Sequence, residues 1–259
     1  MRAWRSFPRT ATQGPRRNHP RAVRLDDSPT SRLRYNMPMR TLLVGGVSID
    51  RDEAFAHARA YLTDGSRWAY PSYDAYESER AAGPLTDADF LAPVLLNVNQ
   101  LKIGTYEALK QVRGTLDEVL TRIPVDLDLT EATPEDLQML GELFTVLDSP
   151  GVQGARGTVL SKVLHRKRPR FIPLYDEQVR AVYQDGRAAT VTQRPKGGRT
   201  WAEFIVVFAT AVQADLGREH IFWQQIAALA TGPTITTLRA LDIVAWWAGG
   251  PLSPDTAAP

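Results

Sequence analysis

The residues best suited to do chemistry lie between residues 149 and 176, where a glycine-rich segment precedes a basic helix and an isolated aspartate. The glycines of this segment are Gly151, Gly154 and Gly157. Glycine lets an anion approach the backbone closely, and the free N–H groups at a helix start favour negative charge. We therefore predict an anion site at the start of the following helix, near Arg156, Gly157 and Thr158.

Basic side chains continue along this helix without a single acid. They are Lys162, Arg166, Lys167, Arg168 and Arg170. Because the apolar residues between them need burial, we expect the basic side chains, and His165 beside them, to face outward. The hypothesis is that Lys162, Arg166, Lys167 and Arg168 bind nucleic-acid phosphate. Two alternatives are a solvated helix face and a basic segment that neutralises an acidic neighbour.

Asp176 follows this basic helix after a short extended link, Phe171–Tyr175. It stands at the predicted start of the next helix, where its charge is favoured by the N–H groups and the helix dipole. Two interpretations remain: Asp176 is a plain N-cap, or it is a catalytic carboxylate.

The order of these features resembles the helix–hairpin–helix DNA glycosylases, which have a Pro-Gly-Val-Gly hairpin, a helix, an extended link and an aspartate. Pro150, Gly151, Val152 and Gly154 match the hairpin if Gln153 is an insertion, and Asp176 matches the aspartate. The resemblance implies that Asp176 stabilises an oxocarbenium-like sugar, or positions water, as a flipped base departs. The nucleophilic lysine of bifunctional members falls on Arg156 or Gly157, so a monofunctional enzyme is implied.

Aromatic residues crowd the loop over residues 63–84. Trp68, Tyr70 and Tyr73 are candidates for stacking on a base, and the alternative is packing beneath the loop. Farther along the chain, Asp242 interrupts an apolar helix, and we expect it to form a buried structural pair with Arg239, three residues earlier.

A second resemblance covers more of the chain, from about Tyr73 to Trp247. It is to a family of uncharacterised bacterial proteins of actinobacterial type. The phrases that carry it are Leu160-Ser-Lys-Val-Leu-His-Arg-Lys-Arg-Pro169, Ile172-Pro-Leu-Tyr-Asp176 and Leu241-Asp-Ile-Val-Ala-Trp246. This resemblance implies no function.

The charge of the chain is segregated along its length. The net charge is +2, but residues 1–40 hold ten arginines and only two aspartates, so the remainder is acidic. Within that remainder, residues 151–200 hold eleven basic and three acidic side chains. A uniformly basic nucleic-acid binder is excluded, whereas one local field for an anionic ligand is favoured.

Composition excludes several classes of site and of location. The chain has no cysteine, and its four histidines are scattered, so we expect no disulfide, no metal site and no cofactor. No apolar run approaches the roughly 20 residues that a membrane span needs. The start of the chain lacks the apolar segment of a secretory signal. We therefore expect a soluble cytoplasmic protein with no membrane partner.

The elements predict an all-α, multi-helix globular domain over residues 41–252, with a short β element near residues 41–49. Helical patterns follow Asp50, Thr86, Thr105, Thr133 and Asp176, and others fill residues 155–166, 200–216, 219–229 and 237–247. Residues 1–40, rich in Pro, Arg and Ser, and residues 253–259 are expected to be disordered tails.

Removal of residues 1–38 is expected to leave the stability of the protein unchanged. This segment contributes almost no aliphatic surface to a core. Thermal melting of the full and truncated chains checks the prediction, and a melting temperature lowered by several degrees would show that the tail docks.

Three functions remain open at this stage. The first is a DNA-binding protein of helix–hairpin–helix glycosylase type, with monofunctional base excision. The second is a non-enzymatic DNA-binding or regulatory module. The third is a helical domain whose basic stretch meets the acidic face of a protein partner. The position of Asp176 relative to an open pocket separates the first from the other two.

Overall fold

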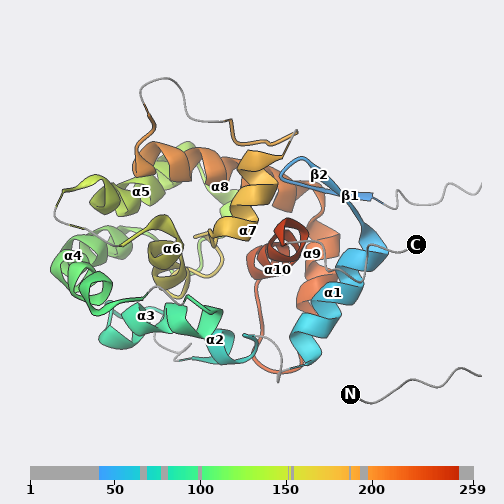
Figure 1. Ribbon diagram of the computed structural model, residues 1–259, viewed down its shortest axis with the longest axis horizontal. Coiled ribbons are helices and arrows are strands. Elements are labelled where there is room, and N and C mark those ends of the chain that lie inside the picture. Colours follow the sequence, from blue (N-terminus) through green and yellow to red (C-terminus); the bar gives the residue numbers. More distant parts are fainter. Residues whose placement is uncertain are drawn as a thin grey trace, which may run out of the picture. The chain divides into compact units, whose positions relative to one another are not determined.

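The computed structural model describes residues 41–64, 69–76, 81–98, 101–150, 152, 155–186, 188–192 and 198–250. Both expected tails lie outside these ranges, as do the candidate residues Trp68, Gly151 and Gly154. In the described part the fold is helical, with a two-stranded hairpin before the first helix, as predicted (Figure 1).

The chain enters the fold through an antiparallel hairpin of β1 (Thr41–Val44) and β2 (Val47–Asp50), in which Leu42 pairs with Ile49. The two-residue turn is Gly45-Gly46, and both glycines have positive φ, as a tight hairpin turn requires. The N–H of Gly45 donates to Asp215 Oδ2 at 2.7 Å. This bond ties the turn to a helix 170 residues later in the chain.

The helices begin where side-chain oxygens can accept the first free N–H groups. In α1 (Arg51–Thr63), Asp50 accepts from the N–H groups of Asp52 and Glu53. Capping boxes start three later helices, with Thr86 and Asp89, Thr133 and Asp136, and Thr200 and Glu203. The remaining elements are α2 (Ser72–Ala75), α3 (Asp87–Leu91), η2 (Ala92–Leu96), α4 (Ile103–Arg122), η3 (Leu129–Glu131), α5 (Pro134–Phe144), η4 (Thr145–Asp148), α6 (Gly157–His165), α7 (Glu177–Arg180), η5 (Ala181–Asp185), α8 (Trp201–Arg218), α9 (His220–Ala227) and α10 (Thr237–Gly249).

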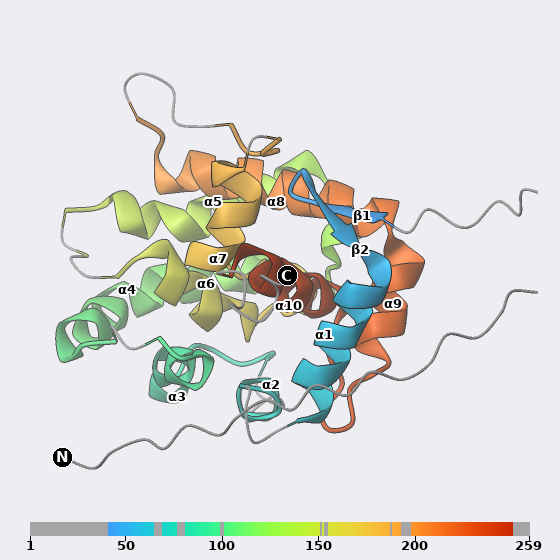
Figure 2. The same ribbon diagram turned by 45° about the vertical axis from the view of Figure 1, so that its right-hand side comes forward.

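Helix α10 is the centre of the fold, with α1 and α9 on one side and α6 and α7 on the other (Figures 1 and 2). Its residues 238–245 are buried without a break, as expected for a helix surrounded by other elements. Gly249 has no side chain where a Cβ would strike the backbone of Gln178, so α10 approaches α7 closely. The two helices together form the floor and one wall of the site described below.

The predicted outward basic face is wrong for Lys162, Arg166, Lys167 and Arg168, whereas the side chain of Arg170 is 55% exposed, as expected. Lys162, Lys167 and Arg168 are 3%, 1% and 5% exposed, and the side chain of Arg166 is also buried. Lys167 Nζ lies 3.0 Å from Asp89 Oδ2, and Arg166 Nε lies 3.4 Å from Asp89 Oδ1. The alternative that the basic segment neutralises an acidic neighbour is therefore confirmed for Arg166 and Lys167.

Arg168 has a different structural task, which is to satisfy the carbonyls at the end of α4. Its Nε donates to the Ile123 carbonyl at 2.7 Å, and its Nη2 donates to the Leu120 carbonyl. The Leu120 carbonyl also accepts the Ile123 N–H, so Arg168 adds a donor at a helix end, where carbonyls have few partners. Neither Lys167 nor Arg168 is accessible to a phosphate.

The structure favours the packing alternative for Tyr70 and Tyr73, and the predicted outward position of His165 is wrong. Tyr70 and Tyr73 are buried, so their ring faces are covered by protein and cannot stack on a base. Tyr73 donates its hydroxyl proton to the Lys162 carbonyl at 2.6 Å, which confirms packing beneath the loop. His165 is buried as well, with Nδ1 2.7 Å from the Ile172 carbonyl oxygen.

No helix in the described part of the chain combines the length and apolarity needed to cross a membrane.

Candidate functional site

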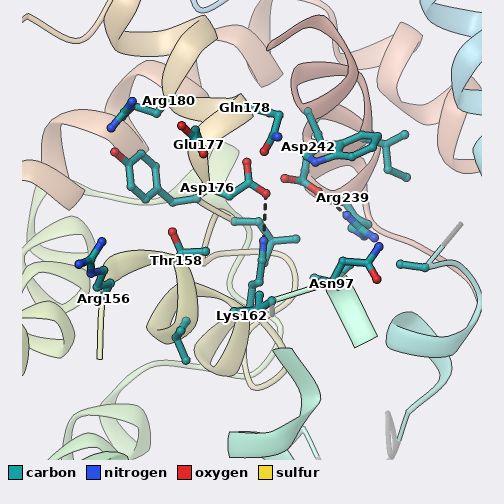
Figure 3. A pocket seen from close by; sticks show the side chains of 18 of the residues that line it. Asn97, Arg156, Thr158, Lys162, Asp176, Glu177, Gln178, Arg180, Arg239 and Asp242 are labelled. Carbon is teal, nitrogen blue, oxygen red and sulfur yellow. Dashed lines mark hydrogen bonds and ion pairs between the residues drawn. The ribbon is translucent and has the colours of Figure 1, made fainter. Parts of the chain in front are cut away.

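A pocket of about 630 Å³ opens where α6, α7 and α10 meet (Figure 3). Helix α6 contributes its first two turns, α7 its N-terminal end, and α10 its middle. The segment after η2, from Leu96 to Val98, closes one side. The pocket therefore draws on segments that are up to 185 residues apart in the chain, from Tyr61 to Trp246.

Asp176 lies in this pocket and also caps α7. The N-cap interpretation is therefore confirmed, and the position in a pocket keeps Asp176 a candidate catalytic carboxylate. Its Oδ1 accepts from the Val179 N–H at 3.1 Å, which is the predicted N-cap bond. Its Oδ2 accepts from Lys162 Nζ at 3.0 Å (Figure 3). The side chain of Asp176 is 15% exposed, toward the pocket.

Lys162 reaches Asp176 from the second turn of α6. Its side chain is almost wholly buried, and its ammonium group is directed at the carboxylate instead of at the outer surface. The predicted phosphate contact is replaced by an ion pair inside the pocket. A buried ammonium needs a partner of this kind because desolvation of an unpaired charge is costly.

The start of α6 forms the outer rim of the pocket. Arg156 is the residue before the helix, and its side chain is exposed. Arg156 and Thr158 both line the pocket, as the predicted anion site requires. In the described part of the chain, no acidic side chain lies within ion-pair distance of Arg156. Arg156 therefore contributes a positive charge to this rim, and Glu177 at the start of α7 also lines the pocket.

Gly157 owes its lack of a side chain to packing, which the sequence analysis did not foresee. A Cβ on Gly157 would strike the ring of Trp201, which lies across the first turn of α6. The same ring is part of the pocket wall, and its centroid lies 6.1 Å from that of Tyr175 in an edge-to-face contact. Gly157 therefore keeps Trp201 in place on the wall.

Replacement of Gly157 by alanine is expected to displace Trp201 and to lower the free energy of unfolding by about 1–3 kcal/mol, as overpacking does. Thermal melting measures the loss of stability, and a change in tryptophan fluorescence reports the displacement of Trp201. Gly114→Ala is the matched control, because a Cβ there meets nothing and should stabilise α4 by about 0.5–1 kcal/mol. Equal behaviour of the two variants would contradict this role of Gly157.

A second carboxyl group lines the pocket from α10. Asp242 forms the predicted pair with Arg239, whose Nη1 donates to Oδ2, and both side chains are buried. Arg239 also binds Asp74 through Nε at 2.9 Å and the Tyr61 hydroxyl through Nη2 at 2.8 Å. The sequence predicted the pair but not its position in the pocket, for which the only signal was an aspartate within an apolar helix.

The two carboxyl groups of the pocket, Asp176 and Asp242, have different surroundings. Burial raises the pKa of Asp242 to about 6. The Arg239 guanidinium opposes this rise, and the nearby charge of Asp176 adds to it. Asp176, by contrast, accepts hydrogen bonds from an ammonium group and a backbone N–H. Two carboxyls with different surroundings thus face one space, and a buried carboxyl with a raised pKa beside a second carboxyl is typical of acid–base sites.

Neither Tyr70 nor Tyr73, two of the predicted stacking candidates, lines the pocket, and Trp68 lies outside the described residues. Tyr175, Trp201 and Trp246 line it, together with the edge of Tyr61. Tyr175 precedes Asp176 directly, whereas the two tryptophans come from α8 and α10. No cluster of histidine, aspartate and glutamate suited to a metal ion is present among the described residues.

Comparison with known proteins gives one match. A family model described as "Family of unknown function (DUF6308)" matches residues 54–249, which include every pocket residue named above. No curated protein and no solved structure matches the chain. The resemblance to helix–hairpin–helix glycosylases gains no support from these comparisons.

Proposed function

Because the chain belongs to the DUF6308 family, whose function is unknown, we propose a function from the pocket alone. The pocket binds one nucleotide turned out of a DNA strand, and the protein hydrolyses its N-glycosidic bond with the help of Asp176. The observation that carries this proposal is that Asp176 lies in an open pocket beside the start of α6.

The proposed reaction is a displacement at the sugar. The bond between C1′ and the base nitrogen breaks, and its electron pair leaves with the base. Water forms a bond to C1′ and loses one proton. The departing base gains one proton, so charge is conserved. Positive charge develops on the sugar in the transition state, and a fixed carboxylate facing that charge stabilises it. Lys162 and the Val179 N–H hold the Asp176 carboxylate in position for this task.

The size and walls of the pocket suit a nucleotide. Its volume of about 630 Å³ falls within the range of roughly 300–1,000 Å³ found for small-molecule sites. Tyr175, Trp201 and Trp246 line it, and aromatic faces hold a flipped base by stacking. The side chains before and in the first turn of α6, Arg156 and Thr158, are positioned to meet a phosphate at the rim.

Arg156→Ala is expected to weaken DNA binding. It should also reduce the slope of log affinity against log salt concentration by about one, the value for one phosphate contact. The reason is that Arg156 is exposed at the rim and has no acidic partner in the described part of the chain. Arg122→Ala is the control, because Arg122 is exposed, pairs with Glu142 and does not line the pocket. Equal affinity and slope for the two variants would remove Arg156 from the binding surface.

A second candidate is a nucleotide-binding module without catalysis. The observation that favours it is that both oxygens of Asp176 already accept hydrogen bonds within the protein. A carboxylate has about four acceptor positions, so these two bonds still leave room for a ligand. The two candidates predict the same binding and differ only in release of a base.

Base release is the test of the proposal. The protein is incubated with single-stranded and duplex DNA that carries a panel of damaged or modified bases, and free bases are identified by mass spectrometry. Multiple turnovers on at least one substrate are expected. Binding without release from any member of the panel would favour the module, and no binding at low salt would remove both nucleic-acid functions.

A further inference from the structure

Asp242 faces the same space as Asp176 from the opposite side, and this juxtaposition is the starting point (Figure 3). We propose that Asp242 is the general acid that protonates the departing base. This inference rests on the function proposed above and adds a second catalytic residue to it. Sequence analysis gave Asp242 a structural role only, in a pair with Arg239.

The position of Asp242 suits a proton donor. The residue is 7% exposed, and that exposure is toward the pocket it lines. Oδ2 accepts from Arg239 Nη1 and is thereby fixed. Oδ1 has no hydrogen-bond partner among the described residues. This oxygen is not fully buried, so it is accessible from the pocket and available to a ligand.

The charges around Asp242 leave one carboxylate in excess. The groups that face it are Arg239 on α10 itself, Asp74 on α2, Tyr61 on α1, Lys162 on α6 and Asp176 at the start of α7. Arg239 is shared between Asp242 and Asp74, to which it donates two bonds, and Lys162 is paired with Asp176. Two cations thus meet three carboxyls in a buried cluster.

Among the described residues, no further cation pairs with these three carboxyls. Arg166, whose guanidinium lies over the same Tyr73 ring as that of Arg239, is paired with Asp89 instead. Burial lowers the pKa of His165 to about 4, so this imidazole is neutral at physiological pH. Burial raises the pKa of Tyr61, so its phenol is neutral too. A proton on one carboxyl relieves the excess charge. Asp242 is the carboxyl with the free oxygen and with the pKa raised by burial to about 6.

The proposed step balances as follows. As the bond between C1′ and the base nitrogen breaks, its electron pair moves to the base, and the proton on Asp242 Oδ1 moves to a nitrogen of that base. Water then bonds to C1′, and the proton it loses returns to Asp242. Asp176 keeps its negative charge throughout and faces the sugar. One carboxyl thereby acts as acid and the other as electrostatic partner.

The test compares two leaving groups in one assay. A neutral modified purine needs a proton to depart, whereas an N7-alkylated purine already carries positive charge and departs without one. Asp242→Asn is expected to slow release of the neutral base by about a hundredfold or more and to leave release of the cationic base within about threefold. Asp176→Asn is expected to slow release of both bases.

The pH profile gives a second readout. Since the acid must be protonated, release of the neutral base by the wild-type protein should fall as pH rises through about 6. Asp74→Asn removes a negative charge that competes for Arg239. Arg239 then favours the ionised form of Asp242 more strongly, so this descending limb should move to lower pH. Asp74 does not line the pocket, so this variant changes the charge near Asp242 without removing a group from the pocket wall.

Infrared spectroscopy, read together with base release, separates failure of the acid role of Asp242 from failure of the proposed function. A protonated-carboxyl band is expected at pH 5 in the difference spectrum between the wild-type protein and Asp242→Asn, which cancels the bands of the other carboxyls. Base release without this band, or an equal loss of both bases in Asp242→Asn, would overturn the acid role and leave the proposed function intact. The band with no base released from either substrate would overturn the proposed function itself.

Discussion

Asp176→Asn is expected to lower the rate of base release by about a hundredfold or more, with little change in DNA affinity. Asparagine has nearly the same shape, and its side-chain oxygen can still accept the Val179 N–H bond that caps α7. What it removes is the negative charge that faces the sugar. Single-turnover release of the base, measured beside equilibrium binding, separates the two effects.

The ion pair with Lys162 adds a cost in stability that must be separated from the catalytic effect. Lys162 is buried, so loss of its counter-charge destabilises the variant. The double variant Lys162→Met, Asp176→Asn removes both charges and should recover stability but not base release. Recovery of release in the double variant would mean that Asp176 acts only by neutralising Lys162.

Asp89→Ala is expected to lower the free energy of unfolding by about 3–5 kcal/mol, a large part of the 5–15 kcal/mol typical of a domain. Asp89 is the shared partner of Lys167 and Arg166, and all three side chains are almost fully buried. Without the carboxylate, two buried cations lose the counter-charge that Asp89 supplies. Denaturant unfolding followed by circular dichroism measures the loss.

The pH dependence of stability carries the same signature. Burial tends to raise the pKa of Asp89, but the hydrogen bonds from Thr86 and the contact with Lys167 outweigh it, and the pKa lies below its ordinary value. A lowered pKa in the folded state gives stability that is present above about pH 4 and is lost as pH falls further. Asp89→Ala should therefore flatten the acid limb of the stability profile.

Asp87→Ala is the matched control for this prediction, since Asp87 lies on the same helix and pairs with Arg113 at the exposed surface. Its stability should stay near that of the wild type. The alanine triple variant of Arg166, Lys167 and Arg168 should unfold rather than lose DNA binding selectively. Similar stability of Asp89→Ala and Asp87→Ala would contradict the buried network.

Local features of the fold were predictable from the sequence, because helix caps depend on residues three or four positions apart. Thr133 with Asp136, and Asp176 at the start of α7, are examples. The Arg239–Asp242 pair was predictable for the same reason, since its members lie one helical turn apart. The expected match to a family of unknown function is confirmed, over residues 54–249.

The burial of the basic segment was not predictable, because the groups that bury it are remote in sequence. Asp89 lies 77 residues before Arg166, and Asp74 lies 165 residues before Arg239. Periodicity assigns an outward face to a charged residue unless a counter-charge is known to cover it. The pocket walls Trp201 and Trp246 were missed for the same reason, since only the fold brings them to Asp176.

The most direct test of the account is the affinity of the protein for DNA in which one nucleotide is replaced by a cationic azasugar. This group mimics the charged sugar of the transition state and carries no base, so the target base need not be known. Wild-type protein is expected to bind it at least a hundredfold more tightly than the same strand with a neutral abasic analogue. Asp176→Asn should lose most of that preference. Equal affinity of the wild-type protein for the two strands would contradict the claim that Asp176 faces a developing positive charge.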